Sequence, residues 1–192
     1  MNSRWTALFA IVVGLGVALL PIAHRVRNDS LYRNFRVVDP GKLYRSGQMH
    51  PDGFARTVRE HGIKTVVSLR DTKDSAGVHE DQEEMDYCST HGIAFHRQPP
   101  AGWTRVNGVA EADKNIEEFI RLMEAPATPK PVLVHCFAGI HRTGMHVAIY
   151  RMEFNGWTAQ EAIEEMRSMG TPRTTFAANV LEYLETHRLQ RR

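Results

Sequence analysis

Residues 131–144 read PVLVHCFAGIHRTG, and they are the most informative part of the chain about its fold. Pro131–Val134 is an apolar run typical of a strand buried on both faces of a sheet. The residues after the loop, Thr143–Phe154, are predicted to form a helix. A strand joined to a helix by a short loop is the building unit of α/β proteins. The stretch therefore predicts an α/β fold in which this strand lies inside a covered sheet.

Further strands and helices alternate on both sides of this stretch. Gly62 is a predicted helix stop, and Thr158 with Glu161 three residues later is a predicted capping box. Strands are predicted at 43–46, 63–69 and 93–95, and helices at 51–61, 80–91, 111–124, from 158 onward, and at 175–189. This order predicts a central, mostly parallel sheet of four to five strands, flanked by helices.

The loop between Cys136 and Arg142 has the composition of an anion site. Five intervening residues can curl so that their backbone N–H groups point at one centre, and the helix N-terminus after them favours negative charge there. The same field favours a thiolate, so Cys136 is the predicted nucleophile, while Arg142 offers a planar fork for two phosphate oxygens. The predicted substrate-binding residues are Phe137, Ala138, Gly139, Ile140, His141, Arg142 and Thr143.

Two of these residues have specific predicted roles. Gly139 leaves room where a side chain would crowd the bound anion or force a strained φ. Thr143 can donate a hydroxyl hydrogen bond to the sulfur and ease its departure from a phosphocysteine.

The motif His-Cys-x-x-Gly-x-x-Arg-Thr-Gly resembles the signature of the protein tyrosine phosphatase superfamily. The stretches 43–48, 62–70 and 156–163 are similar to its compact dual-specificity branch, especially the small atypical bacterial and fungal or plant members. The resemblance covers residues 37–187. It implies phosphocysteine chemistry on Cys136, phosphate binding by Arg142, and no metal or organic cofactor.

The resemblance also implies an aspartate general acid on a loop before the helix that precedes the signature strand. That loop, residues 98–107, contains no carboxylate. Asp113 is the preferred candidate, with Glu111 beside it, and Asp71 and Asp74 on another loop are rivals. An alternative for Asp113 and Glu111 is that they complement the dipole of the helix that they open.

Other residues of note are assigned structural or open roles. His135 is predicted to hold the loop by hydrogen bonds, and Cys88 to be a buried helix residue. For His141 and Trp103, the sequence allows either a substrate-facing or a structural role. The sequence contains neither a His-x-x-x-His nor a Cys-x-x-Cys pair, so no metal site is predicted.

The N-terminal residues differ from the rest of the chain. Thr6–Ala23 is an uncharged run of 18 residues, about the length that crosses a bilayer core. It is predicted to be a transmembrane anchor rather than a cleaved signal segment. Residues 24–36 are a predicted linker, and residues 37–192 the phosphatase domain. The expected location is single-pass membrane attachment through residues 6–23, leaning towards a cytoplasmic domain because of Arg25 and Arg27, with export as the alternative.

The net charge of the chain and the composition of the loop limit the classes of substrate that are expected. The 192-residue chain has a net charge of only +2, without the basic excess typical of nucleic-acid partners. The expected substrate is phosphotyrosine on a protein, with phosphoserine and phosphothreonine as further candidates. Inositol phosphates or phosphoinositides are the alternative, disfavoured because residues 137–141 contain no lysine. A weakly catalytic phosphate-binding module and a rhodanese-like sulfurtransferase are the alternatives from other classes.

Overall fold

The computed structural model describes residues 31–171 and 175–187, with Val13 and Pro21 as isolated positions. Its sheet has the strand order β1-β2-β5-β3-β4, in which β2, β5, β3 and β4 are parallel and β1 is an antiparallel edge strand. The strands are β1 (Arg36–Asp39), β2 (Leu43–Gly47), β3 (Thr65–Ser68), β4 (Ala94–Arg97) and β5 (Val132–Cys136). The predicted mostly parallel α/β sheet is confirmed.

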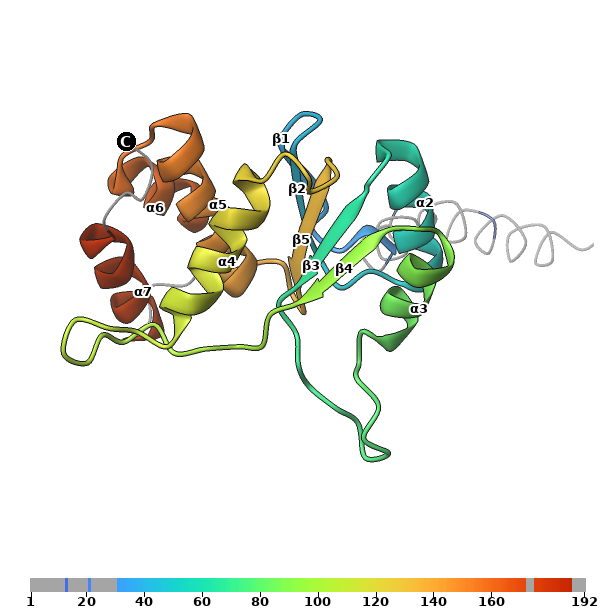
Figure 1. Cartoon of the computed structure of the whole chain (residues 1–192), viewed down its shortest axis with the longest axis horizontal. Helices are drawn as coiled ribbons and strands as arrows, with labels where there is room; N and C mark the ends of the chain where they lie inside the picture. The colour runs from blue at the N-terminus through green and yellow to red at the C-terminus, as the bar shows by residue number, and fades with distance from the viewer. Residues whose placement is uncertain (1–12, 14–20, 22–30, 172–174, 188–192) are drawn as a thin grey trace, which may run out of the picture.

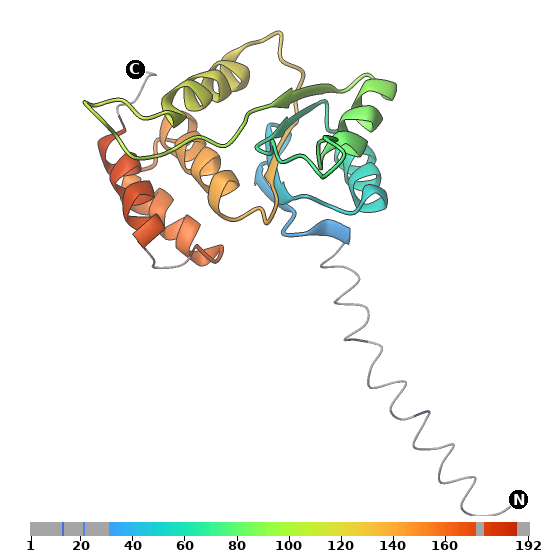
Figure 2. The ribbon, with the colours of Figure 1, turned by 90° about the horizontal axis from the view of Figure 1, so that it is seen from below.

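Helices cover both faces of this sheet. Figures 1 and 2 show α2 and α3 on one side of the sheet and α4, α5, α6 and α7 on the other. The helices are α2 (Pro51–His61), α3 (Gln82–Thr90), α4 (Ala112–Glu124), α5 (His141–Asn155), α6 (Ala159–Ser168) and α7 (Thr175–Thr186).

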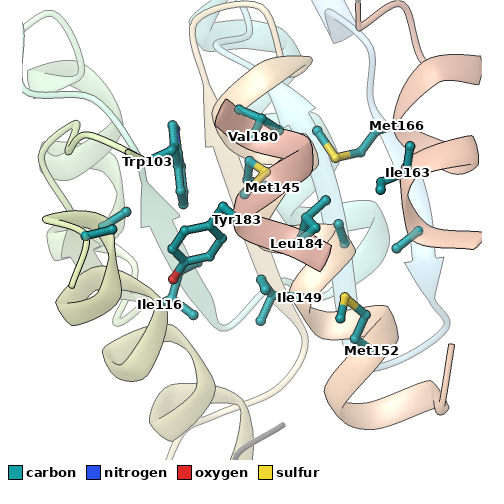
Figure 3. Packing of buried hydrophobic residues seen from close by; sticks show 14 of the residues in the cluster. Trp103, Ile116, Met145, Ile149, Met152, Ile163, Met166, Val180, Tyr183 and Leu184 are labelled. Atoms are coloured by element: carbon teal, nitrogen blue, oxygen red, sulfur yellow. The ribbon is translucent and has the colours of Figure 1, made fainter. Parts of the chain in front are cut away.

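The two layers follow from side-chain alternation along the strands. Val66 of β3 packs with Phe54 of α2 in one core, and the next residue, Val67, packs with Phe119 of α4 in the other. A third cluster joins α4–α7 around Tyr183, as Figure 3 shows. Strand β5 is the central strand and is buried on both faces, so its C-terminal residues lie in the interior of the domain.

Local signals in the sequence set several element ends. Gly62 ends α2 in the left-handed conformation, with φ 62°, as predicted. Thr158 and Glu161 form both hydrogen bonds of the predicted capping box at the start of α6. These signals succeed because each depends on residues within one turn of the chain.

The predicted membrane anchor must be corrected. Among residues 31–171 and 175–187, Val13 and Pro21, the structure contains no helix long and apolar enough to cross a membrane. The run Thr6–Ala23 itself lies outside the described residues, apart from Val13 and Pro21. Its 18 residues are near the lower limit for a span, so composition alone was a weak basis. In the described part of the chain the fold class is α/β, without the predicted transmembrane helix, and the prediction of a membrane-attached location is withdrawn.

Candidate active site

Cys136 lies at the C-terminal end of the central strand. In the parallel register it pairs with Gly47 of β2, and its neighbour His135 pairs with Ser68 of β3. The loop 137–140 follows, and α5 starts at His141. The sulfur is thus held between two strands, at the N-terminal end of a 15-residue helix.

The carbonyl groups of this loop are bound by residues outside it. The backbone N–H of Gln48 donates to the Phe137 carbonyl at 3.0 Å, the Asn34 amide to the Ala138 carbonyl at 2.9 Å, and the buried Arg45 guanidinium to the Gly139 carbonyl at 2.8 Å. Because the carbonyls are held outward, peptide N–H groups of the loop can point inward. One of them, Gly139 N–H, donates to the Cys136 sulfur at 3.2 Å.

Glycine is required at position 139. Its φ is +72°, and a Cβ there would lie 2.4 Å from the backbone nitrogen of Gly47 and 2.5 Å from the carbonyl carbon of Ser46. Both the left-handed conformation and the close approach to β2 exclude a side chain. The loop therefore packs directly on the end of β2.

The surroundings of Cys136 favour its thiolate. Burial by itself raises the pKa of the thiol, but hydrogen bonds from Thr143 and Gly139 and the nearby His135 outweigh burial, so the pKa is lowered. The Thr143 hydroxyl also lies 3.5 Å from the Ser46 carbonyl oxygen, to which it can donate. Cys88, by contrast, is buried as predicted, and burial raises its pKa to about 12.

Arg142 is directed by two backbone contacts. Its guanidinium donates to the Leu69 carbonyl at 3.2 Å, on the loop after β3. Its own carbonyl accepts from Nδ1 of the buried His146, one turn later in α5, at 2.9 Å. One contact fixes the side chain of Arg142 and the other fixes its backbone, so the residue is held beside the loop.

Two further arginines gather at the loop. The guanidinium carbon of Arg33 lies 3.8 Å from the ring centroid of Phe137, and that of Arg70 lies 5.0 Å from it. Phe137 is half exposed, and Arg70 is buried and paired with Glu80. The rim of the site therefore carries more positive charge than residues 137–141 alone indicated.

Asp113 is held in a separate network. Its carboxylate accepts hydrogen bonds from the Tyr183 hydroxyl at 2.8 Å, the Ala110 N–H at 2.9 Å and the Arg105 guanidinium at 3.0 Å. Burial raises the pKa of Asp113, but these hydrogen bonds and the Arg105 charge outweigh burial, so the pKa is lowered. Asp113 lines a cavity with Arg105 and Tyr183, whereas Arg142 lines a different one. The contacts are those of a structural carboxylate.

The other candidate acids also have local partners. Glu111 accepts from the Gly102 N–H at 3.1 Å, and Asp74 accepts from the N–H groups of Ala76 and Val78 within its own loop. Asp71 lies 3.4 Å from the His79 ring. These contacts do not bring any of the three to the sulfur.

Two cavities adjoin the loop. The larger, of about 710 Å³, is bordered by Phe137, Gln48 and residues of α2 and α3. The smaller, of about 370 Å³, is bordered by Arg142, His141 and Trp103. Trp103 is largely buried and packs edge-on against Tyr183 at 5.2 Å, so it is both an anchor and part of a cavity wall (Figure 3).

Sequence reasoning missed the residues that hold the loop. Asn34 and Arg33 lie in the stretch assigned to a linker, and Arg45 and Arg70 were noted only as parts of matching motifs. A buried arginine next to a strand end carried no local signal, because its partner, the Gly139 carbonyl, is 94 residues away.

The five-stranded sheet fits the cysteine-phosphatase fold, and the chain belongs to the tyrosine phosphatase family, whose model matches residues 31–192. The predicted resemblance to the atypical dual-specificity phosphatases is thereby confirmed. The chain is 31% identical over 128 residues to the dual specificity protein phosphatase TpbA of Pseudomonas aeruginosa, covering 67% of this chain and 51% of the relative. The chain thus spans about half the length of this curated relative.

Solved structures show the same fold. The crystal structure of P. aeruginosa TpbA in complex with pTyr is 26% identical with a TM-score of 0.59, covering 80% of this chain and 84% of that one. The catalytic core of Siw14, a PP-IP phosphatase from S. cerevisiae, is 22% identical with a TM-score of 0.63, covering 82% and 87%.

Proposed function

We propose that the chain hydrolyses phosphate monoesters through a phosphocysteine intermediate on Cys136. The observation that carries this proposal is the loop whose carbonyls are bound outside it, which leaves inward N–H groups beside a thiol of lowered pKa. The thiolate sulfur attacks phosphorus, the ester P–O bond breaks, and the leaving oxygen takes up a proton. Water then attacks phosphorus, the P–S bond breaks, and the thiolate is restored.

Each step has a supporting residue. Arg142 binds two phosphate oxygens through its planar fork, and the amides of residues 137–143 bind the others. The role proposed for Thr143 is to donate its hydroxyl hydrogen bond to the sulfur as the sulfur leaves. The proposed chemistry needs no metal or organic cofactor, because the nucleophile and the anion site are supplied by the chain. We further propose that the domain begins near residue 31, since Arg33 and Asn34 contact the loop.

The leaving group takes up a proton from a donor when the ester bond breaks. Asp113 was predicted for this role, but its lowered pKa and three hydrogen bonds favour a structural role. A carboxyl that is ionised at neutral pH donates a proton poorly. Phenols are good leaving groups and need such a donor less than alkyl alcohols do, which favours phosphotyrosine over phosphoserine.

The proposed substrate is therefore a protein phosphorylated on tyrosine. The likeness to TpbA, whose crystal structure contains pTyr, supports this assignment. Within residues 137–141 the side chains of Phe137 and Ile140 are apolar, which suits an aromatic ring entering the site.

A second candidate is a phosphorylated inositol or its lipid. Arg33 beside Phe137 favours a substrate that carries additional negative charge, whereas Arg70 is already paired with Glu80. The fold shared with Siw14, named as a PP-IP phosphatase, is compatible with this alternative.

A phosphate-release screen tests the proposal. The full chain is assayed against phosphotyrosine peptides, phosphoserine peptides and inositol phosphates, with Cys136→Ser as the control. We expect phosphotyrosine peptides to be hydrolysed fastest. Cys136→Ser should abolish turnover and still bind phosphate, because Arg142 and the loop amides remain. Turnover near the wild-type rate in Cys136→Ser would rule out the phosphocysteine mechanism, and preferential release from inositol phosphates would favour the second candidate.

A further inference from the structure

A buried ion pair involves His135, the residue before Cys136 in the sequence. Nε2 of His135 is 3.0 Å from a carboxylate oxygen of Glu84, and the two side chains are 1% and 5% exposed. Glu84 lies in the first turn of α3, while His135 is the residue before Cys136 in β5. The pair therefore connects a helix on one face of the sheet to the predicted nucleophile.

A buried charge pair of this kind needs an explanation. Removing two charges from water costs several kcal/mol per ion before their mutual attraction offsets it, and apolar pairs of similar volume are often as stable. Since both side chains are almost wholly excluded from solvent, attraction between them is weakly screened. Burial lowers the pKa of His135, but the Glu84 carboxylate outweighs it, so the pKa is raised and the ring tends to be charged.

Other charges also face this region. The charged and titratable groups around the pair and the sulfur are Arg45 on β2, Arg70 after β3, Asp81 before α3, Cys88 on α3, Arg97 on β4 and Arg142 on α5. Asp81 is occupied by two hydrogen bonds from Arg97 and one from Ser68. Glu84 is thus the carboxylate that pairs directly with His135 in the described part of the chain.

We infer that Glu84 is a positioning residue for catalysis, whose carboxylate acts through His135 to keep a positive charge beside the Cys136 sulfur. The inference rests on the proposed role of Cys136 as nucleophile. It differs from the predicted role of His135 in holding the loop by hydrogen bonds, because no hydrogen bond joins the His135 ring to the loop among the described residues. An imidazolium next to a thiol favours the thiolate, which is the reactive form in attack on phosphorus.

The test measures thiol reactivity rather than phosphatase activity. The full chain is alkylated with iodoacetamide across a pH series, and Cys136 and Cys88 are quantified separately by peptide mass spectrometry. In Glu84→Gln we expect the midpoint of the Cys136 profile to rise by about one pH unit, so that alkylation below both midpoints slows about tenfold. The matched control Glu83→Gln, an exposed neighbour on the same helix, should leave the midpoint unchanged.

Two measurements separate this role from a purely structural one. In a His135→Gln background, Glu84→Gln should add no further shift, because the charge through which it acts is gone. In the wild-type protein, which needs no substitution, nitrogen NMR should find the His135 ring protonated at pH 7. A neutral His135 at that pH, or equal midpoints in wild type and Glu84→Gln, overturns the inference. A chain that passes both tests and still releases no phosphate would instead overturn the proposed function.

Discussion

At the residue scale, the chemistry of the loop depends on neighbours that are distant in sequence. Arg142 reaches the Leu69 carbonyl, 73 residues away, and Asp113 reaches the Tyr183 hydroxyl, 70 residues away. These contacts decide which groups are available to a substrate and which are held in place. Two substitutions test this distinction.

Arg142→Lys should lower kcat/KM for a phosphotyrosine peptide by about 10²–10³-fold. An ammonium keeps the charge but cannot bind two phosphate oxygens in one plane. Steady-state kinetics measure the loss, and Arg121→Lys, at an exposed position on α4, is the matched control. Retention of most activity in Arg142→Lys would show that the planar fork is not used.

Asp113→Asn should destabilise the domain by about 1–2 kcal/mol, because it weakens the charge-assisted contact with Arg105. We expect any fall in turnover to be equal for aryl and alkyl phosphates. Urea unfolding and a comparison of the two substrate types measure these effects. A larger loss for alkyl phosphates, with a flattened acid limb of the pH profile, would instead establish Asp113 as the general acid.

At the scale of the element, the loop and the end of β2 behave as one unit. The backbone of residues 46–48 contacts the loop through Gln48 and through the close approach of Gly47 to Gly139. The loop conformation is therefore imposed by β2 as well as by its own residues.

Gly139→Ala should disrupt this unit. A Cβ at 139 meets backbone atoms at 2.4–2.6 Å, whereas one at Gly92, which has a similar φ of +66°, has nothing within 4 Å. Both substitutions incur the left-handed penalty of about 1 kcal/mol, but only Gly139→Ala adds the clash. Thermal unfolding and phosphate binding should both be weakened more in Gly139→Ala than in Gly92→Ala. Equal effects of the two substitutions would mean that the loop can move to accommodate the Cβ without a loss of stability.

At the scale of the whole molecule, two buried histidines make stability depend on pH in opposite ways. His146 packs between Trp103 and Phe119, and burial lowers its pKa to about 4 despite its bond to the Arg142 carbonyl. His135 has a raised pKa. Its contribution is present below the unfolded pKa of about 6.5 and is lost as pH rises through the folded pKa.

For His146 the sign is reversed. Between pH 6.5 and about 4 the unfolded chain binds a proton at this residue and the folded chain does not, so stability falls on acidification. The expected slope is roughly 1.4 kcal/mol per pH unit within that window. Urea unfolding at pH 6.5 and pH 5 measures it, and His146→Gln, which can still donate to the Arg142 carbonyl, should flatten it. An unchanged slope in the variant would assign the effect to other groups.

The sequence pattern alone predicts the α/β class, the order of the helices and of strands β2, β3, β4 and β5, and the Cys136–Arg142 loop, but it did not predict the edge strand β1. Helix caps such as Thr158 with Glu161, and the left-handed Gly62, depend on contacts within a single turn, so they can be recognised locally. The one large error, the membrane anchor, came from composition alone.

The residues that surround the loop are brought together by tertiary packing. Asn34 and Arg45 donate hydrogen bonds to loop carbonyls from elsewhere in the chain. Glu84 pairs with His135, and Tyr183 donates a hydrogen bond to Asp113, in each case between different elements. No periodicity or local motif encodes such contacts, because they arise when β2, β5 and the helices on either face pack together. For the same physical reason, a lone Asp113 in the sequence looked available as an acid, and in the fold it is bonded to three donors.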